Sequence, residues 1–312
     1  MITIEQFMTN NPQYLTGGYS EVAKKYGVSY ETVRHVARKL RRGDVSPKAS
    51  NAIQLNPEEF AEFKAWRVSK SPKAKYFKRK KELPKPYLNG DPNNVLVIPD
   101  THLPFELDDA LEFLREQQEK WNCGTVVHIG DFLDNCSTSF FDKDPDGFTP
   151  GDEFTAVLEK AKDWYSVFPN VKICIGNHDA RPFRQAFKAG LPKKWLKSYE
   201  EMLECPEGWQ WDFNHEINGV IYTHGTGSSG DLASMNLARE NRQSTVIGHL
   251  HSLSNVRYLA NSKDTIFGMT VGCLLKNDEY AFSYGKEMPR KPVLNCGVVL
   301  NGTLPILIPY SK

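Results

Sequence analysis

Five short segments of the sequence combine an apolar run with a turn that carries Asp, Asn or His. The central one runs from Val171 and ends in Gly176-Asn177-His178-Asp179. Carboxylate, imidazole and amide oxygen, without a thiolate, are ligands for hard to borderline divalent cations. The segments therefore predict a metal-dependent site. Their polar residues are Asp100, His102, Asp131, Asp134, Asn177, His178, His224, His249 and His251, which include five of the chain's eight histidines.

The apolar part of each segment is short and rich in β-branched residues, which is typical of a buried strand of an α/β sheet. Ligands of such sheets bind at the carboxyl ends of the strands. The sequences 108–121 and 152–168 have the apolar periodicity of helices and lie between the first three strands. They predict parallel strands joined by crossover helices. After residue 224 we expect further strands over 255–260, 265–271, 293–300 and 305–309.

In chain order these motifs read DxH, GDxxD, GNHD, H and GHxH, and this series resembles the calcineurin-like metallophosphoesterase superfamily. The resemblance covers about residues 91–312 and not the first ninety. It implies the α/β fold of that superfamily, an αββα sandwich of two mixed sheets. The sequences DTHLP, GDFLD and GNHD are similar to the phosphodiesterase and DNA-repair nuclease branches. Protein Ser/Thr phosphatases continue GDxxD with Arg-Gly, where this chain has Asn135-Cys136.

The resemblance also implies which residues hold metal ions. One cation would be held by Asp100, His102, Asp131 and His251, and the other by Asp131, Asn177, His224 and His249. A bridging Asp131 would set the ions ~3.5–4 Å apart, and they would share a hydroxide that attacks phosphorus in line. We expect manganese, with iron, zinc or nickel as alternatives.

His178 takes the role of a non-ligand in this resemblance, contacting the phosphoryl group and assisting the leaving group. Asp134 would hydrogen-bond that imidazole and orient it; the alternative is an ordinary turn residue. Arg181 and Arg184 follow the catalytic turn, and a phosphate clamp is one hypothesis for them. His128 in a strand and His215 without a motif partner are not expected to be ligands.

Charge is distributed unevenly along the chain. Residues 1–90 contain 18 Lys and Arg against 8 Asp and Glu, a net charge of +10, whereas residues 91–312 contain 21 against 30, a net charge of −9. This asymmetry indicates a basic arm for a polyanion beside an acidic body. The six cysteines are scattered without a CxxC pair, so we expect free thiols.

The segment Tyr19–Arg42 predicts two helices around a tight turn. Ser20 and Ser29 would cap the helices, and Gly27 would end the first with positive φ. The spacing resembles helix-turn-helix DNA-binding modules, which implies a small all-α domain with a recognition helix from Tyr30. The alternative is a helical hairpin used for protein contacts. The expected DNA-binding residues are Tyr30, Glu31, Arg34, His35, Arg38, Lys39, Arg41 and Arg42.

We therefore expect a helix-turn-helix domain over 1–50, a short helix and basic linker over 51–90, and a phosphoesterase domain over 91–312. Within the linker, Asn56–Val68 predicts an amphipathic helix, and Lys70–Lys85 carries eight basic residues. Such a tract adds salt-sensitive affinity for phosphates, or serves as a solvated tether. The long loop after GDxxD, Cys136–Asp152, is a candidate for shaping substrate entry.

Three functions follow from these features. The first is a metal-dependent DNA phosphodiesterase or nuclease that the basic N-terminal module delivers to nucleic acid. The second is a phosphomonoesterase acting on nucleotides, DNA ends or phosphoproteins, and the third is a non-catalytic DNA-binding regulator. The intact ligand set disfavours the third. The chain starts without a signal peptide and has no membrane-spanning run, so we expect a cytoplasmic protein with a nucleic-acid partner and no membrane partner. The domain combination suggests a phage-encoded enzyme, and the sequence leaves the oligomeric state open.

Overall fold

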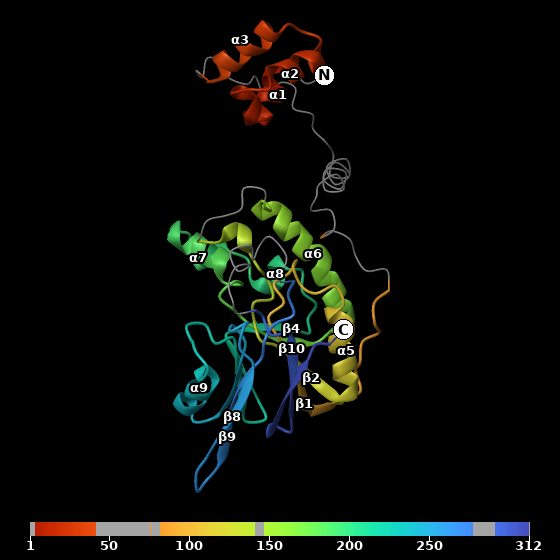
Figure 1. Cartoon of the computed structure of the whole chain (residues 1–312), viewed down its shortest axis with the longest axis vertical. Coiled ribbons are helices and arrows are strands. Elements are labelled where there is room, and N and C mark those ends of the chain that lie inside the picture. The colour runs from red at the N-terminus through yellow and green to blue at the C-terminus, as the bar shows by residue number, and fades with distance from the viewer. Residues whose placement is uncertain (1–3, 42–75, 77–81, 141–146, 277–290, 312) are drawn as a thin grey trace. The chain divides into compact units, whose positions relative to one another are not determined.

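The computed structural model describes residues 4–41, 76, 82–140, 147–276 and 291–311. The chain divides into two compact units, Met1–Arg67 and Val68–Lys312. In the described residues the first unit is helical, and the second, which we call the body, contains the strands (Figure 1). The boundary predicted at residue 50, the helix predicted over 56–68 and most of the basic tract 70–85 lie outside the described residues.

The described residues of the first unit form the helices α1 (Ile4–Asn10), α2 (Tyr19–Tyr26) and α3 (Tyr30–Arg41), with the 3-10 turn η1 (Pro12–Leu15) between the first two. Gly27 ends α2 with φ 63° and donates its N–H to the Ala23 carbonyl, as predicted. The Ser29 hydroxyl accepts from the Thr32 N–H at 3.1 Å and caps α3, also as predicted. The cap predicted at Ser20 is wrong, because α2 begins at Tyr19 with Gly18 in front of it. The shared core comprises Met8, Val22, Ala23, Val33, Val36 and Ala37.

The first sheet of the body is mixed and has the order β11-β10-β1-β2-β3-β4. β1 to β4 run parallel, whereas β10 is antiparallel to both of its neighbours. The strands are β1 (Asp91–Ile98), β2 (Cys123–His128), β3 (Val171–Cys174), β4 (Trp209–Asp212), β10 (Asn295–Leu300) and β11 (Leu304–Pro309).

The second sheet has the order β5-β6-β7-β9-β8 and is also mixed. β6, β7 and β9 are parallel, and the edge strands β5 and β8 are antiparallel to them. The strands are β5 (Asn214–Ile217), β6 (Val220–Thr223), β7 (Ser244–Ile247), β8 (Asn255–Ala260) and β9 (Thr265–Thr270). The strands predicted after residue 224 therefore form within one or two residues of their expected ends.

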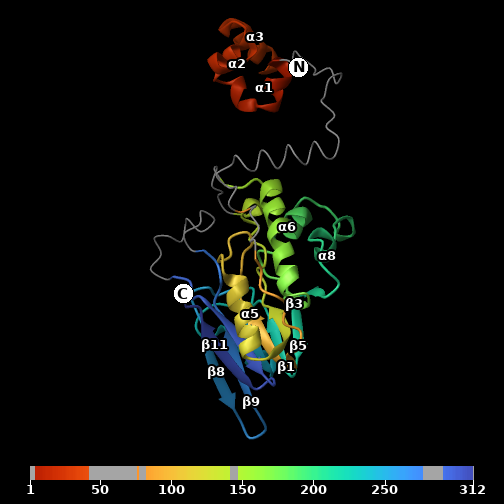
Figure 2. The ribbon, with the colours of Figure 1, turned by 90° about the vertical axis from the view of Figure 1, so that its right-hand side faces the viewer.

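The alternation of side chains along β1 shows how the layers are built. Leu96 and Ile98 point into the core under the helices α5 (Ala110–Lys120) and α6 (Pro150–Val167). Val95 and Val97 point the other way, into a core shared with Tyr222 and other side chains of the second sheet. A further helix, α9 (Ala233–Asn241), covers the far face of that sheet, so the order is helix, sheet, sheet, helix (Figure 1). Figure 2 views the body from the side of α5 and α6. The predicted architecture of two mixed sheets with outer helices is confirmed.

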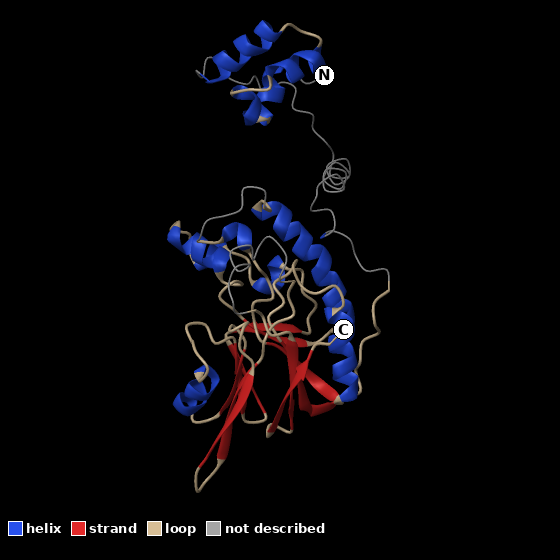
Figure 3. Ribbon diagram, viewed as in Figure 1, coloured by secondary structure: helices blue, strands red, loops and turns tan. Residues whose placement is uncertain are grey.

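Above the strand ends the body carries short helices and loops (Figure 3). They are η4 (Cys136–Thr138), α7 (Arg181–Lys188), η5 (Lys193–Trp195) and α8 (Tyr199–Met202). Tyr76, inside the predicted linker, is buried against the rings of Phe105 and Phe148 at 5.4 and 5.3 Å. This tyrosine therefore belongs to the body, a contact for which the sequence holds no signal. Within the described part of the chain, none of the helices has the length and apolar character to span a membrane.

Candidate metal centre

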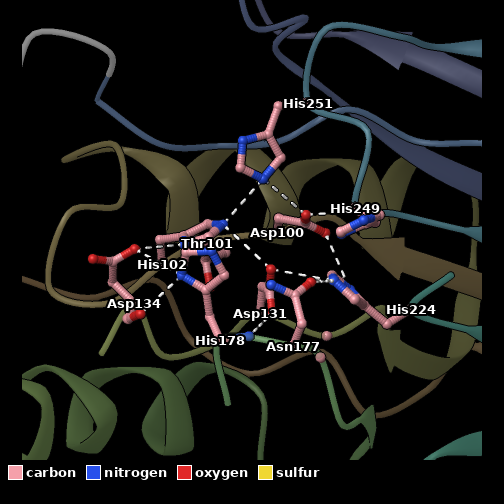
Figure 4. A network of polar contacts seen from close by, with 12 residues as sticks. Asp100, Thr101, His102, Asp131, Asp134, Asn177, His178, His224, His249 and His251 are labelled. Carbon is pink, nitrogen blue, oxygen red and sulfur yellow. Dashed lines mark hydrogen bonds and ion pairs between the residues drawn. The ribbon is translucent and has the colours of Figure 1, made fainter. Parts of the chain in front are cut away.

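Each polar motif of the body follows the carboxyl end of a strand. The turns after β1, β2 and β3 lie side by side because these strands are parallel neighbours, and the turns after β6 and β7 reach them from the second sheet. Three of these turns contain non-glycine residues with left-handed backbones, namely His102 (φ 50°), Asp131 (φ 49°) and His249 (φ 67°). Such conformations cost of order 1–3 kcal/mol each and cluster at functional sites. The strand ends thus bring the motif residues to one place (Figure 4).

Two of the motif glycines are needed where the turns meet. A Cβ atom at Gly176 would collide with Oδ1 and the main-chain nitrogen of Asp131. A Cβ atom at Gly248 would collide with Oδ1 of Asp100. Only a residue without a side chain lets the turns of GNHD and GHxH pack against these carboxylates.

The first group of potential metal ligands comprises Asp100, His102, Asp131 and His251, whose ligand atoms lie within 4.8 Å of one another. Nε2 of His251 lies 3.0 Å from Oδ2 of Asp100 and 3.1 Å from Nε2 of His102. Nε2 of His102 lies 3.8 Å from Oδ2 of Asp131. All but His251 are buried.

The second group comprises Asp131, His224 and His249, again within 4.8 Å. Nε2 of His224 lies 3.2 Å from Oδ2 of Asp131 and 3.1 Å from Oδ1 of Asn177. His249 places its ring against His224, with 5.0 Å between the centroids. The structure therefore brings together all seven residues that the sequence singled out as ligands, in the two predicted sets, with Asp131 common to both.

The hydrogen-bond partners of the imidazole rings indicate that these residues fit cations. Nδ1 of His224 lies 3.1 Å from the Ile129 carbonyl, which can only accept, so Nδ1 carries the proton and Nε2 has a free lone pair when the ring is neutral. Nδ1 of His102 is held in the same way by Oδ1 of Asp134 at 2.8 Å. Oδ1 of Asp100 is buried and has no hydrogen-bond partner among the described residues. When the rings are neutral, lone pairs of imidazole and carboxylate converge here, an arrangement that suits divalent metal ions.

The electrostatics of the metal-free protein lead to the same conclusion. Burial alone would lower the pKa of His224, but the carboxylates of Asp131 and Asp100 raise it to about 10. Burial would raise the pKa of Asp131, whereas the neighbouring His224 and His178 hold it well below its usual range. His102 is different: burial and the nearby His178 lower its pKa to about 4. A proton on His224 thus balances the carboxylates where a cation would otherwise do so.

His178 lies beside both groups and is placed by hydrogen bonds of its main-chain N–H and of both ring nitrogens. Its N–H donates to Oδ1 of Asp131 at 2.8 Å. Its Nδ1 lies 2.8 Å from the carbonyl and 3.2 Å from the carboxylate of Asp134. Because the carbonyl only accepts, Nδ1 is the donor, and Nε2 accepts from Nη2 of Arg181 at 2.9 Å. The expected contact between Asp134 and this imidazole is present, although the main chain of Asp134 lies closer than its side chain.

Two buried carboxylates brace these turns, and the sequence analysis assigned them no role. Asp179 accepts from the N–H groups of Leu133 at 2.8 Å and Gly176 at 2.9 Å, which ties GDxxD to GNHD. Burial raises the pKa of Asp179 to about 7. Glu153 in α6 accepts from two consecutive N–H groups after GDxxD, those of Cys136 and Ser137, each at 2.9 Å. The sequence could have indicated a role for Asp179, because it is the last residue of the GNHD motif. Glu153 lies in a helix, where no motif points to such a role.

The two histidines that were not expected to be ligands lie outside the two ligand groups. His128 is buried at the end of β2, where Nε2 lies 3.0 Å from the Thr101 hydroxyl and Nδ1 accepts from the Gly130 N–H. Burial lowers its pKa to about 3, so it is a neutral core residue. His215 lies on β5 with Nε2 3.0 Å from the Ile173 carbonyl.

The predicted DNA-binding residues belong to the other unit. On α3, Tyr30, Glu31, Arg34, His35 and Arg38 are exposed, opposite the buried Val33, Val36 and Ala37. The side chains of Lys39 and Arg41, and the whole of Arg42, lie outside the described residues.

No curated protein matches the sequence significantly. Among solved structures, Vps29 from Chaetomium thermophilum is similar at 12% identity and a TM-score of 0.35, over 70% of this chain and 98% of that one. A Vps29 single mutant from Entamoeba histolytica is similar at 10% identity and a TM-score of 0.32, over 70% of this chain and 99% of that one. The nuclease MPE of Pseudomonas putida is similar at 15% identity and a TM-score of 0.32, over 69% of this chain and 87% of that one.

The family is identified by its sequence model. The model of the calcineurin-like phosphoesterases matches residues 94–289, which contain all seven potential ligands, His178 and Asp134. This span is more than half of the chain, and the two mixed sheets with outer helices agree with it. The clustered His and Asp residues are able to bind divalent metals, as a metal-dependent phosphoester hydrolase requires. The chain belongs to the calcineurin-like phosphoesterase family.

Proposed function

We propose that the protein is a dinuclear-metal phosphodiesterase that hydrolyses nucleic acid, DNA in the first place. The observation that carries the proposal is the pair of ligand groups that share Asp131. Two divalent cations bound there would polarise the phosphoryl oxygens and lower the pKa of a shared water. Manganese is the cation we expect, with iron, zinc or nickel as alternatives that the same ligands accept.

The part of His178 in this reaction is to give a proton to the leaving oxygen. Burial opposes a charged ring, but the carboxylates of Asp131 and Asp134 raise the pKa of His178 above its ordinary value. Its Nδ1–H stays bonded to the Asp134 carbonyl, so Nε2 is the atom that meets the substrate. Protonation of Nε2 requires the Arg181 guanidinium to leave it, and a bound phosphoryl group offers Arg181 a bidentate partner. When substrate binds, the guanidinium of Arg181 thus gives up its hydrogen bond to Nε2 of His178 and binds the phosphoryl group instead.

Nucleic acid as the substrate is supported by the first ninety residues. Their net charge is +10, whereas that of residues 91–312 is −9. The polar face of α3 presents Arg34, His35 and Arg38 to solvent, and α2 joins α3 through a tight turn at Gly27. Such a helix suits the major groove, and the basic residues add sequence-independent affinity for phosphates. The N-terminal unit delivers the body to DNA.

The test is a manganese-supplemented assay that compares an aryl phosphomonoester, a bis-aryl phosphodiester, single-stranded DNA and duplex DNA. We expect hydrolysis of the diester and of DNA, with little release from the monoester. A preference for the monoester would assign the phosphomonoesterase function instead, and no turnover with two metals bound would leave only the regulator.

The delivery role has its own test. Deleting residues 1–67, which leaves the buried Tyr76 in the body, should leave hydrolysis of the bis-aryl diester intact while it weakens DNA binding and reduces its salt dependence. Unchanged affinity for DNA would refute delivery by the N-terminal unit.

A further inference from the structure

A second basic surface lies on the body itself, next to the metal centre. The segment 180–198 contains six basic residues and no acidic one, whereas residues 91–312 as a whole have a net charge of −9. It forms α7, η5 and the turns around them. Its exposed basic and aromatic side chains, which we call the α7 ridge, are Arg184, Phe187, Lys188, Lys193, Lys194, Trp195 and Lys197.

The aromatic members of the α7 ridge are unusually exposed. Phe187 is 81% exposed and Trp195 70%. α7 is held to the body at Phe183, one turn before Phe187, because Phe183 packs on Tyr199 at 4.7 Å and Tyr199 stacks on Trp211 at 4.6 Å. The exposed rings thus lie on α7 and on η5, the next short helix, beside a ring contact that holds α7 to the body. Large aromatic side chains exposed close together in this way mark an interaction surface.

Cations and rings are interleaved on this surface. The guanidinium of Arg184 and the ammonium of Lys188 lie 5.0 and 4.0 Å from the centroid of the Phe140 ring, which follows η4 and is itself partly exposed. Gln185 on the same helix donates to the Thr138 carbonyl at 2.9 Å. The loop after GDxxD and α7 thus hold several positive groups around aromatic faces, a combination that suits a polyanion with flat, stackable rings.

The ridge is continuous with the metal centre. α7 begins at Arg181, three residues after His178, and the guanidinium of Arg181 contacts Nε2 of that histidine and the carbonyl of Asp134. Arg184 and Lys188 follow along the same helix. A strand whose phosphates lie along α7 would reach His178 with its next phosphodiester.

We infer that the α7 ridge binds single-stranded nucleic acid, with bases stacked on Phe187 and Trp195 and phosphates held by Arg184 and Lys188. In a duplex the bases stack on each other and their faces are closed to exposed side chains, so the rings select single strands. The inference rests on the proposed nucleic-acid substrate and adds its strand state and a binding surface separate from α3. Duplex recognition by the N-terminal unit and single-strand binding by the body are then two distinct contacts.

The test uses the full chain with Phe187→Ala and Trp195→Ala combined, and separately Arg184→Gln with Lys188→Gln. Tyr258→Ala and Arg257→Gln, exposed on β8, are the matched controls. Binding of fluorescent oligothymidine and of a duplex is followed by anisotropy in EDTA, so that nothing is cleaved. We expect the ring variant to bind oligothymidine about tenfold more weakly or worse, with duplex affinity and salt dependence unchanged. The variant with Arg184→Gln and Lys188→Gln should bind oligothymidine more weakly, and its binding should depend less on salt.

Hydrolysis of a bis-aryl phosphodiester separates this inference from the proposed function. If the ring variants cleave the aryl diester like the parent and still bind oligothymidine with parental affinity, the α7 ridge is not a single-strand binding surface. The proposed phosphodiesterase function would be unaffected by that result. A parent that cleaves no diester would refute the function, while the binding comparison still decides the ridge. Vesicles of phosphatidylserine and phosphatidylcholine provide the last arm: ring variants that lose only vesicle binding would assign the surface to a membrane and overturn the inference.

Discussion

Replacing Asp134 with Asn should weaken one metal position and spare the other. Oδ1 of Asp134 lies 2.8 Å from Nδ1 of His102 and 3.2 Å from Nδ1 of His178. Burial alone would raise the pKa of this carboxyl group, but the hydrogen bonds from the two rings lower it, so it is ionised at neutral pH. It therefore fixes the proton of His102 on Nδ1 and turns Nε2 toward Asp131 and His251.

The size of the effect follows from the bond that is lost. A hydrogen bond to a charged group contributes about 1.5–3 kcal/mol, and loss of such an outer partner of a metal ligand typically costs about 10–100-fold in metal affinity. The first ligand group, which contains His102, should weaken by that factor. The second group should not, because His224 is oriented by the main-chain carbonyl of Ile129, which no side-chain substitution removes.

Calorimetric titration of the metal-free protein with Mn²⁺ measures both steps. Asp109→Asn is the matched control, since that carboxylate bonds Tyr310 at 2.7 Å and belongs to neither ligand group. We expect two binding steps in the parent and in the control. In Asp134→Asn, only the step that belongs to the first ligand group should lose affinity for Mn²⁺. Equal weakening of both steps, or none, would refute the assignment of Asp134 to His102.

Three further outcomes are expected. His178→Ala should keep both metal ions and lower turnover of a bis-aryl diester by about 10²–10⁴-fold, measured as metal content and kcat, and full activity would remove this residue from the mechanism. Gly176→Ala should displace Asp131 and weaken both metal positions in the same titration, whereas Gly151→Ala, with nothing within 4 Å of its new methyl group, should not; tight binding by the first variant would contradict the packing argument. Because burial raises the pKa of Cys123 to about 12, iodoacetamide at pH 8 should label it only after unfolding, as read by peptide mass spectrometry, and rapid labelling of the native thiol would show that it is accessible.

Much of the fold and of the site is predictable because strands of an α/β sheet end in a crevice. An apolar run such as Val171–Cys174 specifies a buried strand, and the polar residues that follow can only lie at its carboxyl end. Five such ends in order are enough to group the ligands and to name the family. The helices α5 and α6 follow from their periodicity between the strands.

What could not be predicted depends on contacts between residues far apart in the chain. Glu153 reaches back from α6 to the N–H groups after GDxxD, and nothing in its own neighbourhood indicates that task. Arg181 was one of two candidates for a phosphate clamp, and only the structure shows that it already bonds His178. Tyr76 lies in a basic tract typical of a tether, yet it is buried against Phe105 and Phe148. The local sequence pattern determines the helices and strands, whereas such contacts form only when these elements pack together.

The position of Asp131 between two ligand groups is the central claim, and anomalous diffraction from crystals grown with manganese tests it most directly. We predict two peaks about 3.5–4 Å apart, both within bonding distance of the Asp131 carboxylate, one beside His102 and His251 and the other beside His224 and His249. A single peak, or two peaks that do not share Asp131, would contradict the account.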